Sequence, residues 1–249
     1  MASKPKPPAA SGLRPADHKR NLAMQIGLIA VVVVFAVGLL GYIVVSNRHT
    51  DSGSQAIRVT SSKLVTKEGT DEPKAVLSFY EDFLCPACGK LERAFGPTVS
   101  RLIDSGAIAA DYHMVAILDR PDNDDYSSRA GAAAYCVAAE NIDAFRRFHT
   151  ALYTEQLQPS EIGKDFPDNK RLIEVAREAG AAGTVPGCIN SGKYRKMVAG
   201  SARAAGIHAT PTLRINGTDY TPSTPEALVD KIREIVGDLP GMQAPAKGA

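Results

Sequence analysis

The sequence contains no tryptophan, and only 6% of its 249 residues are aromatic. It also lacks an excess of one charge, because 29 basic and 27 acidic residues give a formal net charge of +2. Five of the basic residues and one acidic residue lie in the first 20 positions, so the rest of the chain is close to neutral. Nucleic-acid-binding proteins usually carry a basic face and aromatic platforms for stacking bases. The composition therefore predicts no nucleic-acid partner.

Charge is absent from one long segment, Leu22 to Val45, which is 24 residues long. As a helix it would extend roughly 36 Å, which is enough to cross a hydrocarbon core of roughly 30 Å. The alternative is a cleaved secretory signal, whose apolar part is usually about 7 to 15 residues long and ends at a small-residue site. This run is longer and ends in Val-Val-Ser-Asn. The sequence therefore predicts one uncleaved N-terminal transmembrane helix.

The charges that flank this run predict its orientation. Basic residues precede it and only Arg48 follows closely, which favours a cytoplasmic N-terminus and a single-pass protein of the cell membrane. Residues 1–21 are expected to form a disordered cytoplasmic tail, and residues 46–70 an extracytoplasmic tether. Residues 71–240 would form the folded extracytoplasmic domain, and residues 241–249 a second disordered tail.

Apolar periodicity predicts an α/β fold with one mixed sheet. A β-prone run at Ala75–Tyr80 is followed by helical spacing that continues past Pro97, and then by a second apolar run at 107–118. Residues 119–205 contain four helical patterns with no strand between them. Asn216-Gly217 between short β-prone runs then predicts a hairpin, because a type I′ turn needs positive φ at both central positions. A final helix is expected after Thr224-Pro225.

The reactive chemistry is concentrated in Cys85-Pro86-Ala87-Cys88, at the expected start of the first helix. Free N–H groups and a partial positive charge at a helix N-terminus stabilise a thiolate, and Pro86 suits the first helical position. In such surroundings the pKa of a cysteine thiol can fall from about 8.5 to about 3.5–7.5. Cys85 is therefore the expected nucleophile and Cys88 the resolving thiol of dithiol-disulfide exchange.

Two other interpretations of the Cys-x-x-Cys pair are a zinc site and a short structural disulfide. A tetrahedral zinc site needs two further Cys or His ligands at compatible spacing. Cys136 and Cys188 are 52 residues apart, and His113, His149 and His208 show no ligand spacing. A structural disulfide in so short a loop would remove little entropy from the unfolded chain. The sequence predicts neither a metal site nor a cofactor.

Two sequence segments, separated by the helical block, resemble those of a known protein family. They read Asp82-Phe83-x-Cys85-Pro86-x-Cys88 and Gly206-Ile207-x-x-Thr210-Pro211-Thr212. With the helical block between them, the chain resembles, over residues 71–237, the DsbA-like branch of the thioredoxin superfamily and its membrane-anchored Gram-positive and actinobacterial relatives. The resemblance implies a thioredoxin-like mixed sheet with a large helical insertion.

The resemblance also implies a cis Thr210–Pro211 bond in a loop that faces the disulfide and holds substrate through the backbone of Thr210. From the residues alone, a trans proline that opens a strand is the alternative.

The chain departs from the family at two positions. Ala87 stands where strong oxidases of this kind have histidine, which predicts a less stabilised Cys85 thiolate. Phe79 stands where thioredoxin-like proteins often have a buried acid. Glu81 and Asp82 are the nearest acids, and they are either proton-transfer groups or a solvated strand end.

The remaining cysteines, Cys136 in a helical pattern and Cys188 in an expected loop, form the second pair. Outside the cytoplasm two such cysteines are expected to be bonded to each other. Closing a loop of about 50 residues stabilises a fold by about 4 kcal/mol in the chain-entropy estimate. An electron relay to Cys85 and Cys88 is the rival interpretation. Four cysteines also allow three connectivities, so swapped pairings such as Cys85–Cys136 remain possible from the sequence.

Together, these features predict a monomeric oxidoreductase that introduces disulfides into exported cysteine-containing proteins. The resemblance implies a quinone-linked membrane reoxidant of the DsbB or vitamin K epoxide reductase type. The alternatives are a reductase or isomerase of the same fold, or a client-binding module in which the disulfide is incidental.

Overall fold

The computed structural model describes residues 55–242. The predicted cytoplasmic tail, the transmembrane segment Leu22–Val45, the first part of the tether and residues 243–249 lie outside the described residues. Within residues 55–242, no helix is both long and apolar enough to cross a membrane.

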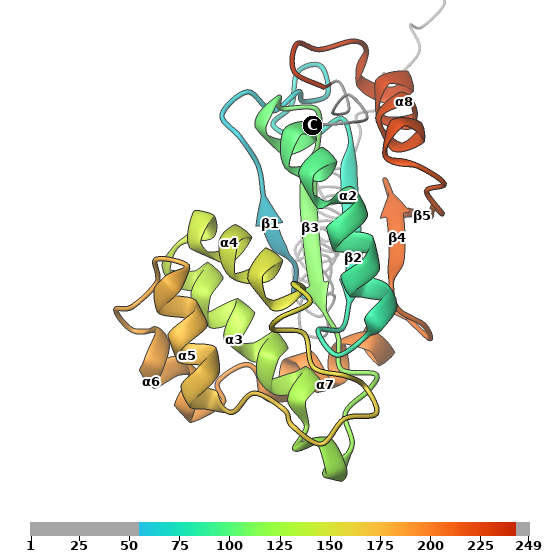
Figure 1. The fold of residues 1–249 in the computed structure, drawn as a ribbon. Helices are drawn as coiled ribbons and strands as arrows, with labels where there is room; N and C mark the ends of the chain where they lie inside the picture. The colour runs from blue at the N-terminus through green and yellow to red at the C-terminus, as the bar shows by residue number, and fades with distance from the viewer. Residues whose placement is uncertain (1–54, 243–249) are drawn as a thin grey trace, which may run out of the picture. The chain divides into compact units, whose positions relative to one another are not determined.

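In the described part of the chain, five strands form one mixed sheet in the order β1-β3-β2-β4-β5 (Figure 1). The strands are β1 (Ile57–Val59), β2 (Val76–Glu81), β3 (Ala109–Met114), β4 (Thr212–Ile215) and β5 (Thr218–Asp219). Only β2 and β3 are parallel, and the other neighbours are antiparallel. The strand that leads to the cysteine motif is therefore in the middle of the sheet, which explains its almost continuous apolar sequence.

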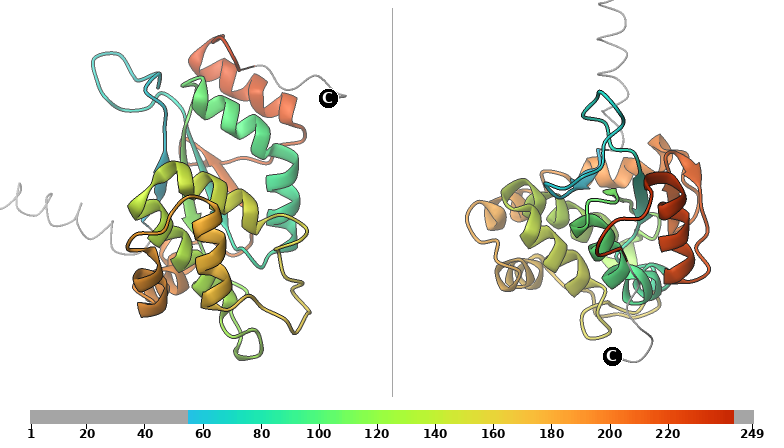
Figure 2. Two further views of the ribbon diagram at one scale, coloured as in Figure 1. Left: turned by 60° about the vertical axis from the view of Figure 1, so that its left-hand side comes forward. Right: turned by 90° about the horizontal axis from the view of Figure 1, so that it is seen from above.

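Helices cover both faces of this sheet. On one face lie α2 (Pro86–Asp104) and α8 (Pro225–Val236), which pack against each other (Figure 2). The expected helix continues through Pro97 without interruption. On the other face, Tyr80 packs with Ile207 and with Ala202 of α7 (Arg195–Ala204).

The predicted helical block is present and contains five helices instead of four. A short 3-10 turn, η1 (Pro121–Asn123), leads into α3 (Tyr126–Glu140), α4 (Ile142–Leu152), α5 (Asn169–Glu178), α6 (Val185–Ser191) and α7. The extra helix, α6, occupies the residues around Cys188 that were expected to form a loop, and that expectation was wrong. At seven residues α6 is too short to show an apolar period.

The boundaries of two strands also differ from the prediction. The second apolar run was expected to form a strand over 107–118, but β3 ends at Met114. Its partner β2 ends opposite, at Glu81, so the apolar residues beyond Met114 have no strand to pair with. The hairpin turns at Asn216 and Gly217 as expected, with φ of 49° and 82°.

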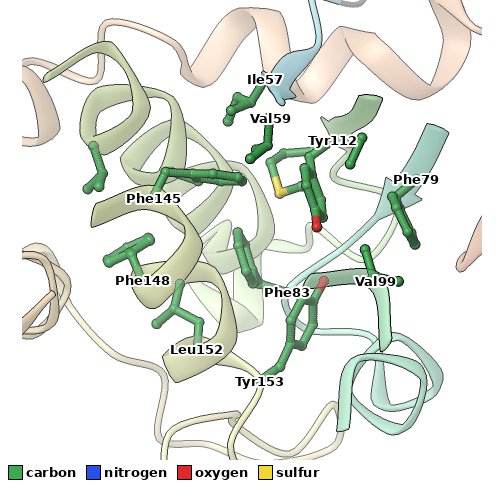
Figure 3. Close-up of a cluster of buried hydrophobic side chains, with 14 of the residues drawn as sticks. Ile57, Val59, Phe79, Phe83, Val99, Tyr112, Phe145, Phe148, Leu152 and Tyr153 are labelled. Atoms are coloured by element: carbon green, nitrogen blue, oxygen red, sulfur yellow. The ribbon is translucent and has the colours of Figure 1, made fainter. Parts of the chain in front are cut away.

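The helical block joins the sheet through an aromatic core. Phe145, Phe148 and Leu152 of α4 are buried in the same cluster as Phe83, and Phe145 points toward the strands (Figure 3). The ring of Phe145 meets Tyr112 of β3 edge-on, with centroids 5.4 Å apart. The same face of α4 therefore fixes its position beside the end of β2, where the cysteine motif begins.

Candidate active site

Cys85 lies at the junction of β2 and α2. It is the N-cap residue of α2, it has extended backbone angles, and Pro86 begins the helix. Its Sγ lies 3.4 Å from the carbonyl oxygen of Thr210. Cys88, one turn into the helix, is completely buried, and both cysteines are free thiols in this structure.

The surroundings lower the pKa of Cys85 to about 5. The largest contribution is a hydrogen bond from the Cys88 thiol, and burial opposes it. The hydroxyl of Thr210 and the backbone N–H groups of Cys88 and Ala87 stabilise the thiolate further. The corresponding thiol has a pKa of about 3.5 in DsbA and about 7 in thioredoxin, so the pKa of Cys85 lies between the two. The thiolate is the form that attacks disulfides.

The pKa of Cys88 is shifted in the opposite direction. Burial raises it most, and the hydrogen bond that this thiol donates to Cys85 raises it further. The pair therefore consists of one ionised thiol at the surface end and one protonated thiol inside. This asymmetry matches the nucleophile and resolving roles predicted for the two residues.

The Thr210–Pro211 peptide bond is cis, as the family resemblance implied. It directly precedes β4, and β4 pairs with β2, so the register of the sheet brings this loop to Cys85. The fold thus places Thr210 next to the Sγ atom of Cys85, although the two residues are 125 positions apart in the sequence.

Glu81 and Asp82 are both buried, so the solvated strand end considered for them is wrong. The side chain of Asp82 accepts hydrogen bonds from the N–H groups of Leu84 and Leu118, at 2.9 and 3.0 Å. Its pKa is raised to about 6, mainly by burial. Asp82 therefore holds the loop before the motif to the loop after β3.

The side chain of Glu81 instead forms an ion pair with a histidine that the sequence pattern did not assign to the site. His149 Nε2 lies 2.7 Å from Glu81 Oε2, and both side chains are buried. His149 Nδ1 lies 3.7 Å from Glu92 Oε1 of α2. The usable sequence signal was a polar residue on the apolar face of α4, next to Phe145, Phe148 and Leu152.

Gln158 is a second site residue that the sequence pattern did not indicate. Its Nε2 donates to the carbonyl oxygens of Cys85 and Phe83, at 2.9 and 3.3 Å. A Cβ on Gly89 would lie 2.0 Å from Gln158 Oε1, so the glycine leaves room for the position that this side chain takes. The segment after α4 is thereby attached to the motif backbone. No local pattern indicates such a contact, because it depends on the tertiary fold.

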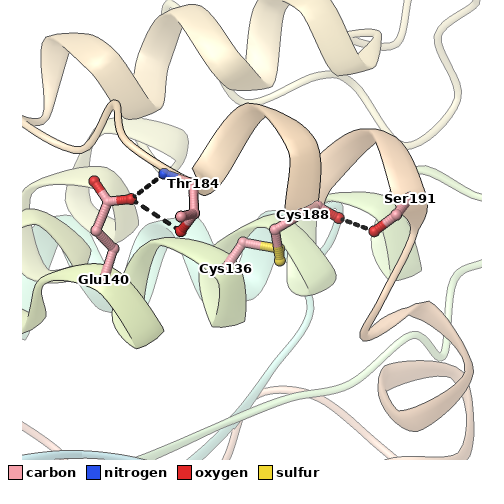
Figure 4. Close-up of a disulfide and its surroundings, with 5 residues drawn as sticks. All are labelled: Cys136, Glu140, Thr184, Cys188 and Ser191. Carbon is pink, nitrogen blue, oxygen red and sulfur yellow. Dashed lines mark hydrogen bonds between the residues drawn. A yellow bond between two sulfur atoms is a disulfide. The ribbon is translucent and has the colours of Figure 1, made fainter.

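The disulfide predicted between Cys136 and Cys188 is formed, and it joins α3 to α6 (Figure 4). One turn from Cys136, the Glu140 carboxylate accepts hydrogen bonds from the N–H groups of residues 182–184 and from the Thr184 hydroxyl. The covalent bond and this carboxylate fix the start of α6 together. Residues 55–242 contain no group of three or more His, Cys, Asp or Glu side chains arranged to hold a metal ion.

Comparisons with known proteins agree with this geometry. The family model described as Thioredoxin matches residues 66–234. The crystal structure of oxidised DsbA from Mycobacterium tuberculosis is 70% identical, with a TM-score of 0.75, and the match covers 76% of this chain and 96% of that one. The reduced disulfide bond oxidoreductase DsbG from the same organism is also 70% identical, with a TM-score of 0.74, over 75% of this chain and 90% of that one.

A more distant likeness shows the fold alone. The thiol-disulfide oxidoreductase MdbA from Corynebacterium diphtheriae is 24% identical, with a TM-score of 0.57, over 73% of this chain and 93% of that one.

Among curated proteins, the serine/threonine-protein kinase PknE of Mycobacterium tuberculosis is 28% identical over 156 residues. That match covers 62% of this chain but only 27% of the kinase, so the chain spans about a quarter of that relative's length. The family model match and the two structures at 70% identity show that this chain belongs to the DsbA-like branch of the thioredoxin superfamily and is a thiol-disulfide oxidoreductase.

Proposed function

We propose that this oxidoreductase donates disulfides to exported proteins through Cys85. The observation that carries the proposal is the pKa of Cys85, which is lowered to about 5. A stable thiolate stabilises the reduced pair, and a stabilised reduced form makes the corresponding disulfide a stronger oxidant.

The proposed reaction has two exchange steps. A substrate thiolate attacks Cys85 Sγ of the oxidised pair, the Cys85–Cys88 bond breaks, and Cys88 leaves with the electron pair and takes up a proton. A second substrate thiolate then attacks the substrate sulfur of the mixed disulfide and releases Cys85 as a thiolate. The substrate loses two electrons and gains a disulfide, and the enzyme becomes a dithiol.

Substrate is proposed to lie along the cis-proline loop. A cavity of about 290 Å³ beside this loop is lined by Leu91, Pro211, Leu213, Tyr220 and Pro222, among others. An extended chain whose cysteine reaches Cys85 would pass the backbone of Thr210 and place a neighbouring apolar side chain here. The partly apolar lining suits unfolded clients, because these expose apolar side chains.

Of the two acids considered for proton transfer, we assign Glu81 to Cys88. Both oxygens of Asp82 are occupied by backbone N–H groups. Glu81 is buried and acts electrostatically on the Cys88 thiol, and burial raises its own pKa. A carboxyl group whose pKa is raised can both accept and return a proton.

The proposed location follows from the sequence. Leu22–Val45 would anchor the chain as a single-pass protein of the cell membrane, with the domain outside the cytoplasm. A quinone-linked membrane protein of the DsbB or vitamin K epoxide reductase type would reoxidise Cys85 and Cys88. Protease added to intact cells should then digest the domain and spare the N-terminal tail. Digestion only after lysis would contradict this orientation.

The reduction potential of the Cys85–Cys88 pair tests the proposed direction. The full chain in detergent would be equilibrated with glutathione buffers, and its free thiols counted by alkylation. We expect a potential nearer the value of about −120 mV for a strong oxidase than the value of about −270 mV for thioredoxin. A potential at the thioredoxin end would instead assign a reductase.

Client oxidation supplies the second readout. Cys85→Ser should abolish disulfide formation in a reduced model substrate, and Cys88→Ser should accumulate mixed disulfides on Cys85. If Cys85→Ser retained full activity in preventing aggregation of unfolded clients while oxidation was never seen in the native chain, the client-binding alternative would be correct.

A further inference from the structure

The buried Cys88 thiol needs a route by which it can exchange its proton with solvent. It is completely buried, yet it must lose a proton each time the dithiol becomes a disulfide and regain one when the disulfide is reduced. Glu81 can take that proton, but the Glu81 side chain is itself only 1% exposed. A second exchange, between Glu81 and water, is therefore needed in every cycle.

Two further side chains extend from Glu81 toward the surface. The Nε2 atom of His149 lies 2.7 Å from Glu81 Oε2, and its Nδ1 lies 3.7 Å from Glu92 Oε1. The imidazole thus lies between two carboxylates on different elements, β2 and α2. No other ionised side chain forms an ion pair with His149 within residues 55–242.

Glu92 reaches the surface. Its side chain is 13% exposed, and Oε1 accepts a hydrogen bond of 2.9 Å from the Thr150 hydroxyl. It lines a groove of about 480 Å³ between α2 and α4, together with Gly96, Pro97 and Thr154. A Cβ on Gly96 would lie 2.7 Å from Glu92 Oε1, so the absence of a side chain there leaves space for this carboxylate.

We propose that Glu81, His149 and Glu92 form the route by which the proton of Cys88 exchanges with solvent in the groove between α2 and α4. His149 and Glu92 are positioning residues in this reaction, because neither touches the reacting sulfur atoms. The inference rests on dithiol chemistry at Cys85 and Cys88, but it is independent of the direction proposed above.

In each transfer, one proton enters the route from Cys88 and one proton leaves it to water. When Cys88 attacks the mixed disulfide on Cys85, its thiol proton passes to Glu81, and the substrate sulfur leaves as a thiolate. His149 then gives its Nδ1 proton to Glu92, and Glu92 releases it to water. Reduction of the disulfide runs the route backwards. Before the transfer Glu81 and Glu92 are ionised and His149 is protonated, and after it Glu81 is protonated, His149 is neutral and Glu92 is ionised. The three side chains carry one net negative charge in both states, so no additional charge is left buried.

The other groups that face His149 do not compete for the proton. Tyr112 of β3 and Tyr153 after α4 place their rings 4.8 and 5.1 Å from the imidazole. Burial raises the pKa of both hydroxyls, so they stay protonated. The two carboxylates hold the pKa of His149 at about 10 despite its burial, so the imidazole is protonated at pH 7. The other two aromatic rings in contact with the imidazole, those of Phe83 and Phe145, are apolar.

The test separates attack by Cys85 from resolution by Cys88. Reduced full-length chain in detergent is mixed with dithiobis(nitrobenzoate) in a stopped-flow instrument, and the coloured thiolate appears in two phases. Cys85 attack gives the first phase, and Cys88 attack on the resulting mixed disulfide gives the second. Glu92→Gln keeps the size of the side chain and can still accept from Thr150, but it cannot take a proton. Glu155→Gln is the matched control, because Glu155 lines the same groove and has no contact with His149.

We expect Glu92→Gln to slow the second phase at least tenfold at pH 7 and to leave the first phase unchanged. Its second phase should then rise about tenfold per pH unit, because hydroxide must remove the proton, whereas the native chain and Glu155→Gln should level off. His149→Gln should behave like Glu92→Gln.

A second phase in Glu92→Gln with the rate and pH profile of Glu155→Gln would overturn the proposal. If His149→Gln does not fold, the Glu92→Gln result still decides. The reduction potential plays no part in this assay, so failure of the proton route and failure of the oxidase assignment give different results.

Discussion

The thiolate of Cys85 is stabilised although the third residue of its motif has no polar group. Ala87 contributes only its backbone N–H, while the Cys88 thiol makes the largest contribution and the Thr210 hydroxyl adds a further one. The expectation that loss of the motif histidine weakens stabilisation agrees with a pKa between those of DsbA and thioredoxin. The cis-proline loop therefore acts on the reactivity of the sulfur.

Removal of the Thr210 hydroxyl should raise the pKa of Cys85. A hydrogen bond to a charged group is worth about 1.5–3 kcal/mol, which corresponds to about 1–2 pKa units. We expect Thr210→Val to give this increase in the pH profile of iodoacetamide alkylation. Thr212→Val is the matched control, because that hydroxyl donates to the carbonyl oxygen of Ala209. Equal profiles for the two variants would remove Thr210 from this role.

Single residues show what the sequence could and could not predict. Cys85 and Cys88 could be predicted as the reactive pair because helix-end chemistry acts over four consecutive residues. His149 was not predicted, because its contact with Glu81 joins positions 68 apart and no local spacing encodes it. The burial of Glu81 and Asp82 was missed for the same reason, since it depends on helices from the insertion that cover the end of β2.

At the scale of elements, the helical insertion is fastened by the bond between α3 and α6. The sequence predicted the cysteine pair correctly but not the short helix that carries Cys188. Helix α6 contains Pro186 and Gly187 and has only seven residues, so its stability comes from its surroundings. The disulfide and the hydrogen bonds of the Glu140 carboxylate attach α6 to α3 and so stabilise it.

The structural role of this disulfide predicts a loss of stability without a loss of chemistry. The double variant Cys136→Ala, Cys188→Ala should lose about 4 kcal/mol of unfolding free energy, as the chain-entropy estimate for its loop gives. Urea unfolding measures this value, and Glu140→Gln provides a smaller perturbation at the same site. The rate at which Cys85 attacks a disulfide should stay unchanged. A large fall in turnover by a still-folded double variant would favour the electron relay instead.

The molecule as a whole should respond to pH differently in its two redox states. In the reduced form, Cys85 has a pKa of about 5 when folded and about 8.5 when unfolded. Between these values the unfolded chain binds the extra proton, so the stability of the fold rises with pH. Cys88 has a raised folded pKa, so its contribution is lost as the pH rises above about 8.5.

The difference in unfolding free energy, reduced minus oxidised, should therefore rise from pH 5, reach a maximum near pH 8.5, and then fall. Contributions from groups common to both states, such as His149 and Asp82, largely cancel in this difference. Urea titrations of both redox forms at several pH values would measure it. A difference that is flat between pH 5 and 8 would mean that Cys85 is not ionised in the folded chain.

The arrangement of the sheet has a consequence for how the enzyme is made. The centre strand β2 pairs with β4, and Leu77 lies opposite Ile215, a residue near the end of the chain. A ribosome therefore releases the reactive cysteines long before it releases Thr210 and Pro211. During that interval the nascent chain is an unfinished polypeptide with exposed thiols, chemically equivalent to one of the clients proposed for it.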